Sequence, residues 1–266
     1  MQILFLIFLF VVGACIGSFL CCTVRRIHLR NDKRISSNKR SVCLSCHYQL
    51  KWYDNLPIIS WLLLRGKCRK CHQKIGIAEF LSEIAVAAAF LAIGTTINVE
   101  TADVISWLIF IAVISLVIVL SFLAIFDGLY GELPVACLIV SIVFGFIILG
   151  LREYTMIMSP HQISELILPP FLSVLLLGGL YLLLYLISKG KWVGDGDWLL
   201  GTSIGLAIFS PWLAVFILCI SNTLAFLFML PRFIKHRHQK IYFGPFLVIA
   251  FVIVYCLSDQ LLSFII

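Results

Sequence analysis

Two short stretches of the chain carry cysteines at a spacing that suits metal or haem chemistry. They contain the Cys-x-x-Cys pairs Cys43/Cys46 and Cys68/Cys71. Each pair is followed by a histidine, so both stretches read Cys-x-x-Cys-His, a form that takes up haem through two thiols. Two such pairs at this separation equally form a four-thiolate zinc site, because two intervening residues let a tight turn aim both sulfurs at one tetrahedral ion. The spacing alone leaves both alternatives open.

Two aspartates border long apolar runs. Asp127 follows the run 104–126, and Asp197 ends the sequence Gly-Asp-Gly-Asp just before another run. Because an ionised Asp within a membrane span costs at least about 2.5–3.5 kcal/mol, both are functional candidates. Two carboxylates in a partly desolvated site do not readily both ionise, so one keeps a proton and the other acts as general base on water, as in aspartic proteases. Taken singly, either Asp is a helix cap, and Asp197 precedes a helix expected to start at Trp198.

Neighbouring residues could support such a site. Gly194 and Gly196 let the backbone before the second aspartate turn tightly and approach a partner or substrate. Asp195 lies in the same flexible stretch, and we expect it to point elsewhere. Glu79 and Glu83 are four residues apart and therefore share one helix face. They either receive a cationic group of a substrate or favour the N-terminus of their helix.

Membrane helices are the elements that we expect to position these residues. The chain of 266 residues is 62% hydrophobic and 12% charged, with a mean hydropathy of +1.08, which is too apolar for a soluble domain. Apolar runs of about 20 residues predict helices that cross a bilayer. We predict an all-α polytopic membrane protein with about eight spans, at residues 2–22, 80–97, 104–126, 133–151, 166–188, 197–209, 211–231 and 243–264. The sixth and seventh equally read as one span kinked at Ser210-Pro211.

Basic residues indicate which side of the membrane the cysteines face. Thirteen of the 20 Lys and Arg residues lie in the hydrophilic loop 23–78, and loops rich in Lys and Arg stay in the cytoplasm. Eight spans then place 127–132, 189–196 and 232–241 on the same side. Both aspartates are therefore expected at the cytoplasmic face. This clustering accounts for the net charge of +7 without a nucleic-acid partner.

A cytoplasmic loop favours zinc over haem. Haem is attached to Cys-x-x-Cys-His on the outer side of the bacterial membrane, and a reducing compartment also disfavours disulfides. We therefore predict that the four thiolates bind one zinc ion and that His47 and His72 are bystanders. The aromatic segment between the pairs is expected to pack on the membrane face, either as a structural plug or in contact with substrate.

The same residues resemble a known family, the type IV prepilin peptidases, which are bifunctional leader peptidases and N-methyltransferases of pilus, competence and type II secretion systems. The resemblance covers most of the chain and lies in GSFL from Gly17 to Leu20, RSVCLSC, WYDNLPIISWLLLRGKCRKC, Glu83, Asp127 with Pro134, and the Gly-x-Gly-Asp at 194–197. Two positions depart from the family pattern. Leu199 stands where Lys is common, and Val135 stands where a polar residue is usual.

The resemblance implies roles for these residues. Asp127 and Asp197 would be the catalytic pair, supported by Gly194, Gly196, Glu83 and Pro134. The substrate would be a prepilin or pseudopilin precursor, cut after a Gly at the edge of its hydrophobic helix. The new N-terminus would then be methylated, with S-adenosylmethionine as donor.

The resemblance also implies a location and a division of the chain. The protein would lie in the bacterial cytoplasmic (inner) membrane, in contact with lipid, with its active site facing the cytoplasm. Residues 1–22 would form the first helix, 23–78 a cysteine-rich module associated with methyl transfer, and 79–266 the peptidase domain.

Two other classes of protein fit parts of the pattern. A carboxylate-lined transporter would carry its acids nearer the middle of the membrane, preferably with inverted repeats, and the sequence has neither. A non-enzymatic zinc-ribbon scaffold of a pilus or secretion assembly would need the cysteines but not the aspartates.

Overall fold

The computed structural model describes residues 1–28, 42–43, 45–46, 48–157, 163–190, 193–235 and 242–264. The chain folds into two compact units, Met1–Gly94 and Thr95–Ile266, here called the N-terminal and C-terminal units. The first helix and the cysteine-rich loop belong to the same unit as the second long helix, because the two helices pack along their lengths and the loop joins them.

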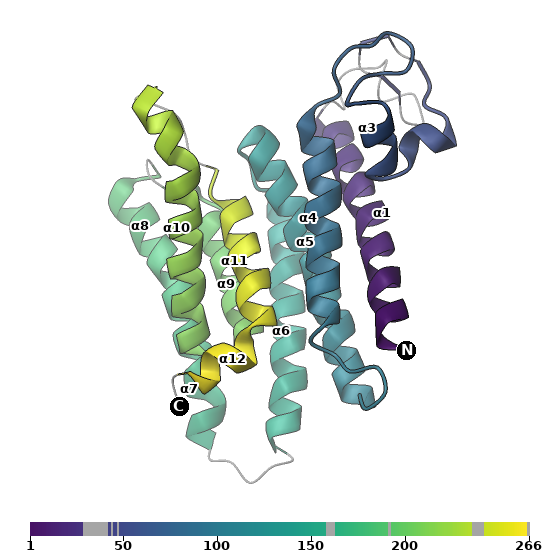
Figure 1. The fold of residues 1–266 in the computed structure, drawn as a ribbon. Helices are drawn as coiled ribbons and strands as arrows, with labels where there is room; N and C mark the ends of the chain where they lie inside the picture. Colours follow the sequence, from purple (N-terminus) through teal and green to yellow (C-terminus); the bar gives the residue numbers. More distant parts are fainter. Residues whose placement is uncertain are drawn as a thin grey trace. The chain divides into compact units, whose positions relative to one another are not determined.

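Two helices, α1 (Gln2–His28) and α4 (Ile77–Gly94), run side by side in the N-terminal unit (Figure 1). Glycines on α1 allow their close approach. A Cβ atom on Gly17 would lie 2.7 Å from the carbonyl oxygen of Ser82, and one on Gly13 would lie 2.9 Å from the Cα of Ala87. Small residues four apart commonly let membrane helices pack backbone to backbone in this way. Between the helices, the loop forms a 3₁₀ turn, η1 (Trp52–Asn55), and a short helix, α3 (Ile59–Leu63).

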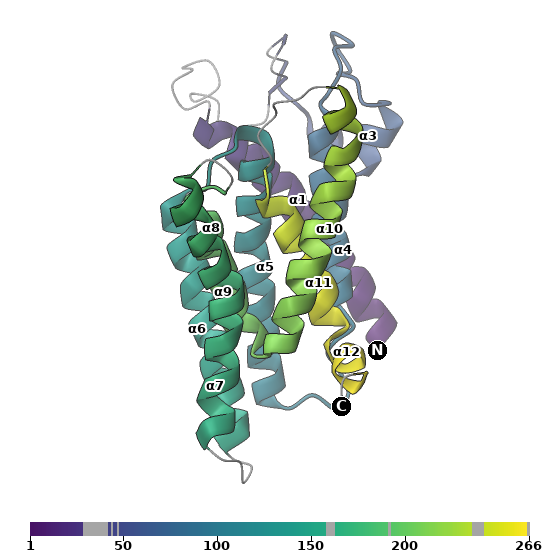
Figure 2. The same ribbon diagram turned by 90° about the vertical axis from the view of Figure 1, so that its left-hand side faces the viewer.

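The C-terminal unit is a bundle of helices (Figures 1 and 2). Its elements are α5 (Val104–Tyr130), α6 (Val135–Ile157), α7 (Ile163–Val174), the π-helical turn η2 (Leu175–Gly179), α8 (Leu180–Ser188), α9 (Asp197–Ile208), α10 (Pro211–Lys235), α11 (Gly244–Cys256) and α12 (Ser258–Ser263). The short helix α9 packs against α6, α7 and η2, while α5 contacts α6 and α11.

Glycines also bring α9 close to its neighbours. A Cβ atom on Gly201 would lie 2.5 Å from the carbonyl oxygen of Leu177, and one on Gly205 would lie 2.9 Å from that of Ser173. The helix is thereby enclosed, and most of its residues are buried although it carries almost no amphipathic pattern. It is a core helix whose first residue is Asp197.

The predicted all-α polytopic fold is confirmed. Six helices of the described residues are long and apolar enough to cross a membrane, and α9 and α11 are shorter apolar helices. The sixth and seventh predicted spans are separate, because α9 ends at Ile208 and α10 begins at Pro211, with Phe209 in a left-handed conformation between them. The fifth predicted span is made of α7, η2 and α8 in succession.

We expect Gly17→Ala to lower the free energy of unfolding by about 1–3 kcal/mol, because the added methyl group meets backbone atoms of α4. Gly150→Ala on α6 is the matched control. A Cβ atom there meets nothing within 4 Å, so helix propensity should leave stability unchanged or raise it by up to about 1 kcal/mol. Denaturant titration of the purified protein in micelles measures both. Equal stability of the two variants would contradict the packing described here.

Candidate active site and metal centre

Asp127 and Asp197 come together in the C-terminal unit. Asp127 lies three residues before the end of α5, and Asp197 is the first residue of α9. Each residue is only 6% exposed. Their carboxylates are close enough to repel each other electrostatically. The two acids that the sequence placed at the ends of different apolar runs are thus neighbours in a buried environment.

A helix N-terminus holds the Asp127 carboxylate. The backbone N–H of Gly244, the first residue of α11, donates to Asp127 Oδ2 at 2.9 Å. A Cβ atom on Gly244 would lie 2.8 Å from the same oxygen, so the absence of a side chain makes this approach possible. Pro245 follows at the start of the helix, where its missing N–H costs nothing. The N-terminal N–H groups of a helix favour a negative charge, so this arrangement stabilises a carboxylate.

Gly244 is a residue of this site that the sequence pattern does not predict. The available signal was the Gly-Pro pair at the start of an apolar run, which is typical of a helix start. That signal predicts where α11 begins, but it does not predict which carboxylate lies there, because Asp127 is 117 residues away in the sequence.

The loop before α9 holds the Asp197 carboxylate. The backbone N–H of Gly194 donates to Asp197 Oδ2 at 2.9 Å. The carboxylate thus turns back toward the preceding loop, and Gly196 occupies the N-cap position without a side-chain cap. A Cβ atom on Gly196 would lie 2.7 Å from side-chain atoms of Leu133, so α9 starts in direct contact with the α5–α6 connection. The simple alternative, in which Asp197 caps a helix that starts at Trp198, does not describe this geometry.

Other residues selected from the sequence occupy less central places. Asp195 is exposed, although it is close enough to affect Asp197 electrostatically. The Pro134 carbonyl accepts the N–H groups of Cys137 and Leu138, so this proline lies immediately before α6 and its carbonyl accepts the first bonds of that helix. Among residues that the sequence did not select, Tyr181 is buried and close enough to Asp197 for an electrostatic interaction.

The four cysteines form one cluster in the N-terminal unit. All four sulfur atoms lie within 4.8 Å of one another. The Sγ atoms of Cys43 and Cys71 are 3.8 Å apart, and those of Cys46 and Cys68 are 4.0 Å apart. A tetrahedral zinc ion with Zn–S bonds of about 2.3 Å needs sulfur atoms about 3.8 Å apart. The cluster can therefore hold a metal ion, and its dimensions fit tetrahedral coordination by four thiolates.

The two Cys-x-x-Cys turns share a backbone hydrogen bond at their first cysteine. The N–H of Cys43 donates to the carbonyl of Tyr48 and that of Cys68 to the carbonyl of Gln73, both at 2.9 Å. A β-bridge flanks each turn, between Val42 and Gln49 and between Lys67 and Lys74. Such repeated turns aim pairs of sulfurs at one point, as the sequence spacing predicted.

Hydrogen bonds in the second turn favour the metal-binding form of its first cysteine. The backbone N–H of Cys71, and then that of Lys70, lower the pKa of the Cys68 thiol to about 7, and the thiolate is the form that binds metal. His72 adopts a left-handed conformation and is not part of the four-sulfur cluster. His47 lies outside the described residues.

Glu83 has a local structural partner. Its Oε2 accepts the backbone N–H of Ile58 at 2.7 Å, and Glu83 is buried. Ile58 has a φ of 63°, a conformation that a β-branched residue rarely adopts. The bond fixes the start of α3 against α4. The two alternatives for this glutamate, receipt of a substrate cation and a favourable effect on the helix N-terminus, stay predictions.

Comparisons with known proteins agree with these features. Residues 11–97 match the family described as Bacterial Peptidase A24 N-terminal domain. A protein of Vibrio cholerae named "Prepilin leader peptidase/N-methyltransferase" is 29% identical over 265 residues, which cover 96% of this chain and 98% of that protein. Proteins of the same name from Myxococcus xanthus and Aeromonas hydrophila are 43% identical over 89 residues and 26% identical over 214 residues.

The extent of these matches differs. The Myxococcus match covers 34% of this chain and 26% of that protein, whereas the Aeromonas match covers 79% of this chain and 69% of that protein. No solved structure gives a significant match. The chain is thus similar to the Bacterial Peptidase A24 N-terminal domain at residues 11–97, and to the Vibrio prepilin leader peptidase/N-methyltransferase over nearly its full length.

We expect the purified protein to carry about one equivalent of metal. The double variant Cys43→Ser/Cys46→Ser should lose this metal, because the two thiolates that remain cannot complete a tetrahedral site. Elemental analysis measures the metal. Cys219→Ser is the matched control, since this exposed cysteine on α10 lies outside the cluster. Retention of the metal by the double variant would show that the cluster is not its site.

Proposed function

We propose that the protein is a membrane-embedded aspartic endopeptidase that removes the short basic leader from type IV prepilin-like precursors and then N-methylates the new N-terminus. The main support is the pair of buried carboxylates, Asp127 and Asp197, which interact electrostatically and are each held by one glycine N–H. The name shared by the relatives supports the substrate class.

The proposed chemistry uses the pair in opposite protonation states. The ionised carboxylate takes a proton from water while the water oxygen attacks the scissile carbonyl carbon, and the protonated carboxylate gives its proton to the carbonyl oxygen. Collapse of the tetrahedral intermediate then breaks the C–N bond, and a proton passes to the leaving amine nitrogen. The bonds from Gly194 and Gly244 would hold the two carboxylates in place throughout.

The short helices support a reaction at the membrane edge. With 12 and 13 residues, α9 and α11 extend about 18–20 Å, which is less than a hydrocarbon core of about 30 Å. Both aspartates lie at the N-terminal ends of these helices. Water needs to enter only part of the membrane to reach them. The basic loop 23–78 favours the cytoplasmic side, where a prepilin leader would also lie.

For the metal cluster we propose a structural zinc ion. Four thiolates fill all four tetrahedral positions, which leaves none for water or substrate, so such a site is typical of structural rather than catalytic zinc. The ion would hold the two cysteine turns together.

For methyl transfer we propose S-adenosylmethionine as the donor and residues 23–78 as the associated module. When bound, the donor supplies an activated methyl group: the lone pair of the free amine forms the new N–C bond, the C–S electron pair returns to sulfur, and the extra proton on nitrogen passes to water. The peptidase reaction would belong to residues 79–266 and to prepilin or pseudopilin precursors in the bacterial inner membrane.

Replacement of either aspartate by asparagine should lower the rate of leader removal by at least about 10²–10⁴-fold, because an amide can neither accept the proton from water nor supply one. The measurement is cleavage of a labelled prepilin-like precursor in membranes that contain Asp127→Asn or Asp197→Asn. Asp259→Asn is the matched control, because this exposed aspartate on α12 is remote in sequence from both acids.

Equal amounts of each variant in the membrane fraction ensure that insertion is not the cause. Full processing by either variant would exclude an aspartic mechanism. An assembly function that survives both substitutions but is lost in Cys43→Ser/Cys46→Ser would instead fit the non-enzymatic zinc-ribbon scaffold.

A further inference from the structure

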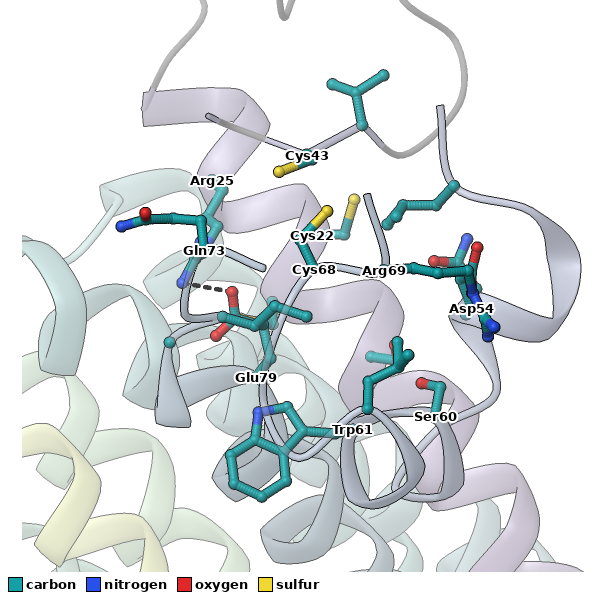
Figure 3. A pocket seen from close by; sticks show the side chains of 18 of the residues that line it. Cys22, Arg25, Cys43, Asp54, Ser60, Trp61, Cys68, Arg69, Gln73 and Glu79 are labelled. Atoms are coloured by element: carbon teal, nitrogen blue, oxygen red, sulfur yellow. Dashed lines mark hydrogen bonds and ion pairs between the residues drawn. The ribbon is translucent and has the colours of Figure 1, made fainter. Parts of the chain in front are cut away.

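A cavity of about 250 Å³ lies within the N-terminal unit, between the C-terminal part of α1, the cysteine loop with α3, and the start of α4 (Figure 3). Cys43 and Cys68 form part of its wall. Its volume lies somewhat below the range for small-molecule sites, which is about 300–1,000 Å³. The Asp127 and Asp197 pair belongs to the C-terminal unit, and neither residue lines this cavity.

Glu79 brings an unused hydrogen-bond acceptor to the cavity. Its Oε1 pairs with Arg25 Nη2 at 2.7 Å, whereas its Oε2 is buried and has no hydrogen-bond partner in the described part of the chain. A Cβ atom on Gly76 would lie 2.9 Å from that oxygen, so the glycine keeps the space beside it open. A buried carboxylate oxygen without a donor costs free energy, which a bound ligand with an N–H group would recover.

Trp61 brings an unused donor to the same cavity. Its Nε1 is buried and has no partner among the described residues. The ring cannot easily turn to find one, because it stacks on Phe80 with centroids 4.4 Å apart and a Cβ atom on Gly66 would lie 2.8 Å from it. Figure 3 shows Trp61 and Glu79 among the side chains around the cavity.

The rest of the lining favours a ligand that is both polar and apolar. Arg25, Arg69 and Lys74 contribute positive charge and Asp54 and Glu83 negative charge, with Arg25 paired to Glu79 and Arg69 to Asp54, while Leu50, Leu64 and Ile75 contribute apolar surface. A small anion would be repelled by the free carboxylate oxygen, and a purely apolar molecule would leave both unpartnered atoms unsatisfied. The lining instead suits a zwitterion joined to a larger ring system.

We propose that this cavity binds the methyl donor, S-adenosylmethionine, with Glu79 Oε2 accepting a hydrogen bond from its α-ammonium group and Trp61 Nε1 donating to an acceptor of the same molecule. The assignment rests on the proposed methyl transfer and adds its location. An N–H donor is required at Glu79, which the ammonium group supplies and the sulfonium group does not. S-adenosylhomocysteine, which keeps the ammonium group, should therefore bind in the same way.

The test is equilibrium binding of S-adenosylmethionine and S-adenosylhomocysteine to the purified full-length protein. Glu79→Gln should weaken both by about tenfold or more, through loss of a charge-assisted hydrogen bond. Trp61→Phe keeps the stacked ring but removes the N–H, so it should weaken binding about 3–10-fold. Trp52→Phe is the matched control and should leave binding unchanged, because Trp52 is 77% exposed and does not line the cavity.

Metal content of each variant reports whether the N-terminal unit is folded. If the wild-type protein binds the donor and folded Glu79→Gln and Trp61→Phe variants bind it equally well, the cavity is not the site, while methyl transfer itself stands. If the wild-type protein binds neither compound, both this assignment and the proposed methyl transfer fail, but the peptidase proposal is unaffected.

Discussion

Burial of two carboxylates in an otherwise apolar bundle is the constraint on which the C-terminal unit depends. Each carboxylate needs a donor, and the chain supplies backbone N–H groups from Gly194 and Gly244. A Cβ atom on Gly244 would lie 2.8 Å from Asp127 Oδ2, so the geometry requires glycine there, and one on Gly194 would make a tight contact of 3.3 Å with Asp197 Oδ2. The bond from Gly244 fixes the start of α11 relative to α5, and the bond from Gly194 fixes the loop before α9 relative to the first residue of α9. The short helices α9 and α11 therefore both start beside the two acids.

Close packing through glycine provides the rigidity that such a site needs. In the C-terminal unit, Gly201 and Gly205 bring α9 within backbone contact of η2 and α7. In the N-terminal unit, Gly13 and Gly17 do the same for α1 and α4. Helices in lipid gain little from the hydrophobic effect when they associate, so van der Waals contact at small residues carries much of the association. The cysteine cluster adds a second means of fixing the loop above α1 and α4.

Much of this organisation could be predicted from the sequence, because apolar run length, Lys and Arg placement and Cys-x-x-Cys spacing are local properties. They predicted about eight apolar spans and one four-cysteine cluster. The described residues contain six helices long and apolar enough to cross a membrane, the shorter apolar helices α9 and α11, and the cluster. Contacts between distant segments could not be predicted in this way. Nothing local shows that Gly244 lies at Asp127, that Glu83 holds the strained Ile58, or that Glu79 keeps one oxygen free. The four-residue spacing of Glu79 and Glu83 suggests a shared role. In the structure they have different partners, because Glu79 pairs with Arg25 and Glu83 accepts the backbone N–H of Ile58.

The pH dependence of leader removal by the purified protein tests most directly whether the two carboxylates act as one pair. If one carboxyl group must be ionised and the other protonated, the rate should pass through a maximum as pH rises and fall on both sides of it. The two apparent pKa values of this profile would belong to the pair rather than to either residue. Loss of either carboxylate should abolish that profile together with activity. A rate that rises with pH to a plateau and stays there would show that no protonated carboxyl group is needed, and would contradict the proposed mechanism.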